Sequence, residues 1–331
     1  GASGMATLKA ALTQTFSASN VADGRVRLAW NSMNTCRTIS TNGTTPSGCT
    51  AFNGMKSLEG THRSNFLNWV VNGLPGNPPG TNLTPSHQMM ARAGDYLSTT
   101  GQYSPYRSEP GSTINNTELS CRKSFNIFMT DGAWNTYQEW PYLDGNRIAR
   151  GGGNADGTDK TFPDGTGYTA FASQTEMYSD QWGIADLSTL ADLAFHYWST
   201  DLQPSLTNDV RPSIRFSGTE TIGGTTLAEY WNLKNNPANW QNMVTYSIGF
   251  NSIATTWAGN PTYTVANGMY GGPGYVGLVN GTTTWSSPLC SNNNSNPDNT
   301  GGNTPCDNST GKWNARGAYR SSELWHMALN S

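Results

Sequence analysis

The sequence predicts an α/β domain with a doubly wound, mostly parallel sheet. Helical and strand patterns alternate in the order helix, strand, helix, helix, strand, helix, strand, helix, which is typical of a sheet covered by helices. The segment 124–130 is apolar at four positions, as expected of a central strand that is buried on both faces: Phe125, Ile127, Phe128 and Met129. Asp131-Gly132 follows directly and places a carboxylate at the carboxyl end of the sheet, where open α/β folds bind ligands.

Three helices and one strand are predicted before this central strand. Residues 5–18 form an amphipathic helix with Met5, Leu8, Leu12 and Phe16 on one stripe. Residues 25–30 alternate like a strand, and residues 64–71 form a short helix. Thr84 is a good N-cap for the next helix, which runs from Pro85 to about Leu97.

After the central strand the chain alternates between ordered elements and polar stretches. Residues 186–201 form the clearest helix, with Ser188 as its cap. A second buried strand is predicted at 243–250 and a final helix at 322–329. The polar stretches read as long irregular insertions into a single domain that spans residues 1–331: about 133–180, 204–239 and 251–318.

The composition indicates a secreted or cell-surface protein. Charged residues make up 12% of the chain and the net charge is −3, so there is no basic face to bind nucleic acid. No apolar run is long enough to cross a bilayer. Uncharged polar residues and many Trp and Tyr side chains form the expected surface.

The five cysteines predict two disulfides. Cys36 and Cys49 flank one polar loop, and Cys290 and Cys306 flank another, which is typical of an oxidising compartment. Zinc is the alternative, but no Cys-x-x-Cys pair or Cys/His cluster favours it. Cys121 is left over, as a buried free thiol or as the partner of a cysteine elsewhere.

One polar stretch has the residue types of a calcium loop. It contains Asp144-Gly145-Asn146, then Gly151-Gly152-Gly153 followed by Asn154, Asp156, Gly157 and Asp159, and then Pro163-Asp164-Gly165. Asp and Asn oxygens in such glycine-containing segments can wrap Ca²⁺. The closing Glu of an EF-hand is missing, so a turn-rich insertion is favoured over a calcium site.

Four segments resemble the hallmark segments of PilY-like proteins, which are the type IV pilus tip-associated adhesins and biogenesis factors of bacteria. They occur in the family's order: Cys121–Asn135, Ser188–Leu202, Asn239–Gly249 and Glu323–His326. The resemblance implies a von Willebrand factor A-like domain that serves pilus biogenesis and tip-located adhesion without catalysis. It also implies export through the periplasm to the cell surface and pilus tip. The implied partners are minor pilins or other tip proteins, a host or surface receptor, and a C-terminal propeller of the same full-length protein.

The same resemblance implies a metal-ion-dependent adhesion site. Thr84 matches its Thr and Asp131 matches its last Asp. The Asp-x-Ser-x-Ser of the family's first strand is absent, so we expect that strand to be missing from this sequence. Mg²⁺ would bind only if an upstream strand completed the site, because it needs several oxygen ligands.

The alternative function is a secreted glycan-binding or glycan-hydrolysing protein. Trp, Tyr and Asn suit sugar stacking and hydrogen bonding, and carboxylate pairs such as Glu176 with Asp180 could serve as acid and base. Among 22 acidic residues such pairs arise by chance. No Gly-x-Ser-x-Gly elbow or phosphate loop occurs, so the sequence favours a protein that is not an enzyme.

Overall fold

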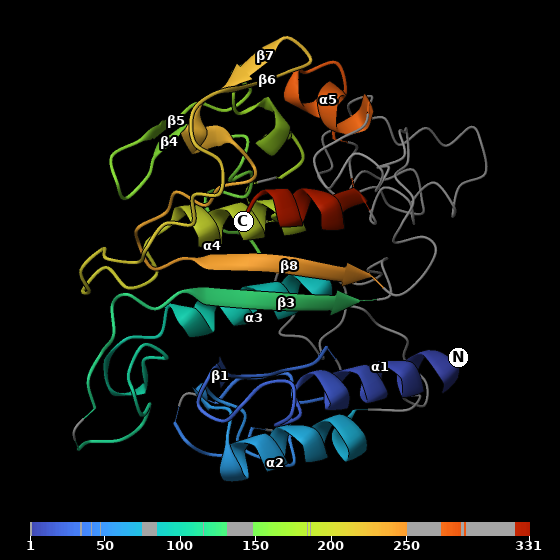
Figure 1. Cartoon of the computed structure of the whole chain (residues 1–331), viewed down its shortest axis with the longest axis vertical. Coiled ribbons are helices and arrows are strands. Elements are labelled where there is room, and N and C mark those ends of the chain that lie inside the picture. Colours follow the sequence, from blue (N-terminus) through green and yellow to red (C-terminus); the bar gives the residue numbers. More distant parts are fainter. Residues whose placement is uncertain are drawn as a thin grey trace. The chain divides into compact units, whose positions relative to one another are not determined.

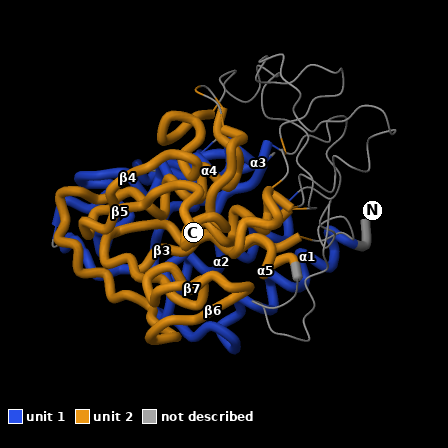
Figure 2. Tube along the Cα trace, turned by 90° about the horizontal axis from the view of Figure 1, so that it is seen from above, with its two compact units in different colours: residues 1–122 blue, residues 123–331 orange. Residues whose placement is uncertain are grey.

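A computed structural model describes most of the chain, in two compact units (Figure 1, Figure 2). Unit 1 covers residues 1–122 and unit 2 covers residues 123–331. The residues whose structure is described are 2–33, 35–40, 42–46, 48–74, 85–114, 116–130, 148–183, 185, 187–249, 273–285, 288 and 322–331. The expectation of a single domain stays a prediction, and each unit is described by itself.

Most of the regular elements described in unit 1 are helices. Its elements, in chain order, are α1 (Ala2–Thr15), β1 (Arg27–Leu28), β2 (Lys56–Ser57), α2 (Gly60–Asn68), a π-helical turn (Trp69–Gly73), α3 (Ser86–Leu97) and a 3₁₀ turn (Gly101–Tyr103). The predicted helices agree with α1, α2 and α3, but the predicted strand at 25–30 shortens to a two-residue antiparallel pairing with β2.

Aromatic rings form the core of unit 1. Trp30 packs against Phe66 with ring centroids 5.3 Å apart. Met5 and Leu12 of α1 pack against the buried cluster that contains these two rings. Cys36 and Cys49 are joined by a disulfide. Cys121 is a free thiol and is exposed, so the expectation that it is buried is wrong.

Unit 2 is built around two parallel strands. Its elements are β3 (Ser124–Thr130), β4 (Lys160–Thr161), β5 (Gly167–Tyr168), a 3₁₀ turn (Glu176–Tyr178), α4 (Leu190–Ser199), β6 (Glu220–Ile222), β7 (Thr225–Leu227), a 3₁₀ turn (Glu229–Trp231), β8 (Met243–Gly249), α5 (Pro273–Val279) and a helix at 322–329. β3 pairs with β8 in parallel, and the pairs β4–β5 and β6–β7 are antiparallel.

The β3–β8 sheet is buried on one face only. Phe128 and Met243 are buried, whereas Ile127 is 51% exposed and Ile248 is 40% exposed. Ile127 pairs with Tyr246, which is 54% exposed on the same face. The prediction of neighbouring parallel strands is therefore confirmed, but the prediction that both faces are buried is wrong. Apolar residues on both faces make a strand suitable for burial, but they do not show whether another element packs against each face.

Helices cover the buried face of β8. α4 contacts β8, and Ser247 Oγ donates to the carbonyl oxygen of Leu324 in the helix at 322–329 at 3.0 Å. Figure 1 shows both helices next to β8. Thr189, not Ser188 as predicted, caps α4, and its side chain accepts from the backbone N–H of Asp192. Ser188 instead donates to the carbonyl oxygen of Gly153.

Two stretches that were predicted to be irregular insertions contribute core residues. Phe162 and Tyr168, from the β4–β5 hairpin, pack with Trp240 in one buried cluster. Leu227 of β7 lies with Tyr275 of α5 in a second cluster. The third predicted insertion is described only at 273–285 and 288. Polar sequence therefore does not mark these stretches as peripheral.

The described residues form a mixed α/β structure with a two-stranded parallel sheet and three short antiparallel pairings. Within these residues no helix combines the length and the apolar character that a membrane span requires. The doubly wound, von Willebrand factor A-like arrangement stays a prediction.

Candidate functional site: a buried carboxylate and imidazole cluster

The adhesion-site residues predicted from the sequence lie outside the described residues. Thr84 directly precedes Pro85, the N-cap residue of α3, and Asp131 directly follows the last residue of β3, Thr130. Cys290 and Cys306 lie outside the described residues as well. The magnesium ligands and the second disulfide therefore stay predictions.

Unit 2 contains a different group of functional side chains, which is buried. Asp156 and Asp192 are 0% exposed, Asp180 is 5% exposed, and His326 and Asn330 are 1% and 2% exposed. We call these five residues the acid–imidazole cluster. They come from two loops, from α4 and from the helix at 322–329 and the residue just after it.

Glycines shape the loop that carries Asp156. Gly152 and Gly153 have φ angles of +82° and +98°, which side chains other than glycine rarely adopt. Asn154 then forms a turn, because its Oδ1 accepts from the backbone N–H of Gly157 at 2.7 Å. The loop can be buried because side-chain groups satisfy its backbone.

Asp192 fastens this loop to the start of α4. Its Oδ2 accepts from the backbone N–H of Thr189 at 2.8 Å, which completes a capping box. Its Oδ1 accepts from the backbone N–H groups of Ala155 at 2.8 Å and Asp156 at 3.4 Å. Three backbone N–H groups therefore surround this one carboxylate.

Asp156 and Asp180 each have a single backbone donor. Asp156 Oδ1 accepts from the N–H of Asp180 at 3.1 Å, and Asp180 Oδ1 accepts from the N–H of Trp182 at 2.8 Å. These bonds fix both carboxyl groups and turn their Oδ2 atoms toward His326, at 3.6 Å from Nε2 for Asp156 and 3.3 Å from Nδ1 for Asp180.

His326 is held by its ring nitrogen Nε2 and by its flat face. Nε2 lies 2.7 Å from the carbonyl oxygen of Tyr178. Since a carbonyl oxygen can only accept, Nε2 carries a proton. The imidazole also stacks on Trp285, with ring centroids 4.2 Å apart and an interplanar angle of 9°. The ring is therefore fixed, with Nδ1 facing Asp180.

Asn330 completes the cluster. Its Nδ2 donates to Asp156 Oδ2 at 2.7 Å and lies 3.1 Å from His326 Nε2. Its Oδ1 is buried and has no hydrogen-bond partner among the described residues. Such an atom costs about 1–3 kcal/mol when it stays unpaired, so it marks a position where a partner is expected.

Burial makes the charge of this cluster costly. Burial first, and then the neighbouring carboxylates of Asp180 and Asp192, raise the pKa of Asp156 well above its ordinary value. Burial and Asp180 likewise raise the pKa of Asp192, although its hydrogen bonds oppose the shift. Three buried carboxyl groups share this cluster, and two of them, Asp156 and Asp180, face one imidazole, so the cluster needs either protons or a cation.

The geometry also suits metal coordination. Asp156, Asp180 and His326 each offer one ligand atom, and these atoms lie within 4.8 Å of one another. Carboxylate oxygen and imidazole nitrogen are common ligands of divalent transition metals.

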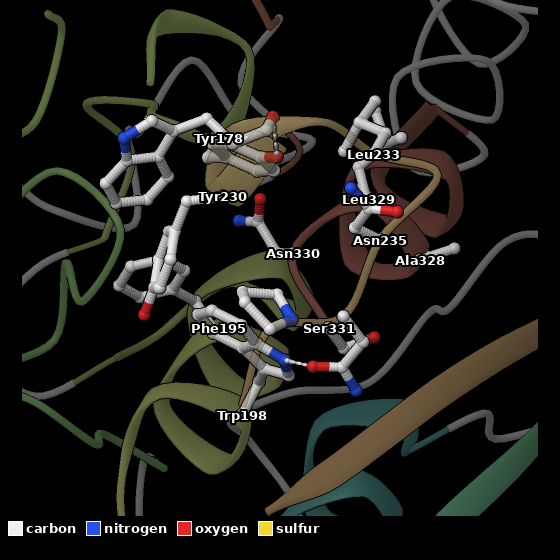
Figure 3. Close-up of a pocket in the computed structure, with 13 residues that line it drawn as sticks. Tyr178, Phe195, Trp198, Tyr230, Leu233, Asn235, Ala328, Leu329, Asn330 and Ser331 are labelled. Atoms are coloured by element: carbon white, nitrogen blue, oxygen red, sulfur yellow. Dashed lines mark hydrogen bonds between the residues drawn. The ribbon is translucent and has the colours of Figure 1, made fainter. Parts of the chain in front are cut away.

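An aromatic pocket adjoins the cluster (Figure 3). Its cavity of about 100 Å³ is lined by Tyr178, Trp198, Tyr230 and Trp231 and includes Asn330. Tyr230 Oη donates to Asp164 Oδ2 at 2.7 Å. The pocket is smaller than the roughly 300–1,000 Å³ of drug-sized ligand sites, so it suits a small group or the end of a longer ligand.

Sequence reasoning found part of this cluster. The sequence predicts a turn-rich insertion at 154–159, with calcium binding as the alternative, and it presents Asp180 only as half of a carboxylate pair with Glu176. The pattern Thr189-x-x-Asp192 before an apolar run is a capping-box signal that could have found Asp192. No local signal connects His326 to Asp156, because 170 residues separate them.

The chain is similar to three curated proteins named "Type IV pilus biogenesis factor PilY1", from Pseudomonas aeruginosa strains PAK, PAO1 and UCBPP-PA14. The identities are 36%, 36% and 33%, and each match covers 92% of this chain. The chain spans about one fifth of the length of these relatives, with 21% of each covered. No protein-family model and no solved structure matches the chain.

Proposed function

We propose that this chain, which is PilY1-like along the segment it shares with its relatives, acts in type IV pilus biogenesis. The similarity of 33–36% over 92% of the chain to proteins named as pilus biogenesis factors carries this proposal. The finer proposal is a von Willebrand factor A-like domain that contributes to adhesion at the pilus tip and is not an enzyme.

Two observations support the von Willebrand factor A-like arrangement. β3 and β8 are parallel neighbours with the register Ser124 to Met243, as in a doubly wound sheet. Asp131 follows the carboxyl end of β3, and Thr84 precedes α3, which agrees with the positions of adhesion-site ligands. Mg²⁺ is the proposed ion there, and an upstream strand would supply the missing Asp-x-Ser-x-Ser.

The proposed location is the cell surface and the pilus tip, after export through the periplasm. The Cys36–Cys49 disulfide is consistent with that route. The proposed partners are minor pilins or other tip proteins, a receptor on a host or surface, and a C-terminal propeller of the full-length protein.

Deletion in the natural full-length protein tests both parts of the proposal. The segment that corresponds to residues 1–331 is removed from the chromosomal gene, and surface pili and attachment are measured separately. Loss of pili supports a role in biogenesis, and normal pili with weak attachment support adhesion. Normal pili together with normal attachment would contradict the proposal.

The magnesium proposal has its own test. Calorimetry compares this chain, the chain extended upstream in its natural sequence, and the extended chain with Asp131→Ala. We expect Mg²⁺ binding only in the unmodified extended chain, because two oxygen ligands do not replace the hydration shell. Equal binding by the extended chain and its Asp131→Ala variant would place the ion elsewhere.

Glycan binding is a second candidate function, favoured by the aromatic pocket. Trp198 Nε1 donates to Asn236 Oδ1 at 3.2 Å, so aromatic faces and amides line the same cavity, as in many sugar sites. A glycan array with the wild-type chain and Trp231→Ala tests it. Binding that disappears in Trp231→Ala supports this function, and a blank array refutes it.

A further inference from the structure

We propose that the acid–imidazole cluster binds one divalent transition-metal ion of the Zn²⁺ type, through Asp156, Asp180 and His326, with Asn330 Oδ1 as a fourth ligand. The ion would be structural and would join the two loops to the helix at 322–329. This inference does not rest on the pilus proposal, and its ligands do not include Thr84 or Asp131.

The distances fit ligands of one ion. His326 Nδ1 and Asp180 Oδ2 lie 3.3 Å apart. With bonds of about 2.0–2.1 Å and a tetrahedral angle, two ligand atoms of Zn²⁺ lie roughly 3.4 Å apart. The three ligand atoms that lie within 4.8 Å of one another can therefore surround an ion after small side-chain rotations.

The orientation of His326 is that of a metal ligand. Nε2–H donates to the carbonyl oxygen of Tyr178 at 2.7 Å, and metal-binding histidines commonly donate their second ring N–H in this way. The neutral ring then presents the Nδ1 lone pair to Asp180 Oδ2. Two acceptor atoms that face each other at 3.3 Å repel unless a proton or a metal ion lies between them.

The carboxylates are arranged in the same manner. Asp156 Oδ1 accepts from the backbone N–H of Asp180, and Asp180 Oδ1 accepts from the backbone N–H of Trp182. Asp180 Oδ2 lies 3.3 Å from Nδ1, whereas Asp156 Oδ2 lies 3.6 Å from Nε2, so the Asp156 side chain must rotate to reach an ion bound at Nδ1. Asn330 adds an independent observation, because its amide contacts Asp156 and His326 while its buried Oδ1 has no partner in the described part of the chain.

Charge balance favours a divalent ion over a monovalent one. Asp156 and Asp180 contribute two negative charges, and neutral His326 and Asn330 contribute none. A divalent ion makes the buried site neutral, which removes the cost of isolated buried charge. Asp192 is excluded from the ligand set because three backbone N–H groups already stabilise its carboxylate.

The ligand types and the burial select the metal class and its role. Mg²⁺ and Ca²⁺ prefer oxygen ligands, whereas an imidazole nitrogen suits Zn²⁺, Mn²⁺, Co²⁺ or Ni²⁺. All four ligand residues are 5% exposed or less. Four protein ligands would leave no coordination position open, which is typical of structural rather than catalytic zinc ions.

Metal content and spectroscopy on the whole 331-residue chain test the proposal. The chain is purified without a polyhistidine tag, stripped with a chelator and titrated with Zn²⁺ or Co²⁺ alone. We expect about one ion per chain and a rise in thermal midpoint on loading. X-ray absorption of the Zn²⁺ form should show nitrogen and oxygen ligands and no sulfur, which excludes the exposed Cys121.

Matched variants locate the ion. Asp180→Asn and His326→Gln should weaken binding at least about tenfold, whereas the controls Asp209→Asn and His196→Gln should leave it unchanged. Asp209 is exposed and His196 lies outside the cluster. If a cluster variant fails to fold, the Co²⁺ absorption spectrum of the wild-type chain still decides, because four nitrogen and oxygen ligands give intense visible bands. A stripped, folded chain that takes up neither ion, or binding that survives both cluster variants, would overturn the proposal.

Discussion

Removing the Asp192 carboxylate should separate the loop at 151–157 from α4. In Asp192→Ala the backbone N–H groups of Thr189 and Ala155 lose acceptors that now lie 2.8 Å away. Both residues are buried, and each unpaired group costs about 1–3 kcal/mol. Relief of repulsion between Asp192 and Asp180 offsets part of this cost, so we expect a loss of about 2–4 kcal/mol in the free energy of unfolding.

Thr189→Ala is the matched comparison. It removes the hydroxyl that accepts from the Asp192 N–H at 3.0 Å and donates to Asp192 Oδ2 at 3.0 Å, leaves the backbone donors of the carboxylate in place, and should cost about 1 kcal/mol. Urea unfolding followed by circular dichroism measures both losses. Hydrogen exchange then shows where the damage lies, because the Ala155 amide should lose protection in Asp192→Ala only.

If Asp192→Ala loses no more free energy of unfolding than Thr189→Ala, this role of the Asp192 carboxylate is refuted. Unchanged exchange at Ala155 would refute it as well, since Asp192 Oδ1 is the acceptor of the Ala155 N–H. Because two compact units can unfold separately, the exchange measurement assigns the effect to unit 2.

Three further predictions concern the same unit. Gly183→Ala should destabilise the fold by several kcal/mol, since a Cβ there would meet the carbonyl oxygen of Gly153; a thermal midpoint equal to that of the wild type would contradict this. Burial lowers the pKa of Lys160 from its ordinary value of 10.5 to about 8. Between these two pH values the unfolded chain binds a proton that the folded chain has released, so the free energy of unfolding should rise with pH. Urea titrations should show that Lys160→Met lacks this rise. Phe128→Ala should cost about 3–5 kcal/mol, because Phe128 is 1% exposed, and Ile127→Ala should cost clearly less in the same assay; equal losses would mean that the second face of the sheet is buried in solution.

The sequence predicted elements whose patterns are local and strong. The helix at 5–18, the strand at 243–250 and the helix at 322–329 agree with the structure within a few residues, because periodic apolar residues report which face packs. The cap of α4 was predicted one residue early. Ser188 and Thr189 both have capping hydroxyls, and only the position of Asp192 three residues later distinguishes them.

The prediction failed where packing partners decide the outcome. Ile127 and Phe128 are equally apolar neighbours, yet they are 51% and 1% exposed. The stretch around Phe162 and Tyr168 was predicted to be irregular because glycine, asparagine and threonine surround it. It reaches the core because side chains such as Asn154 satisfy its turns, and composition alone does not reveal those bonds.

The contrast among the three buried aspartates distinguishes a structural cap from the proposed ion site. In a chain with 12% charged residues, each buried carboxylate needs compensation. Asp192 receives it from three backbone N–H groups, and removing that carboxylate should therefore damage local structure. Asp156 and Asp180 receive one backbone N–H each, so their remaining charge must be met by His326, by a proton or by a metal ion. The stability of the helix at 322–329 should accordingly depend on what occupies the cluster, whereas the start of α4 should not.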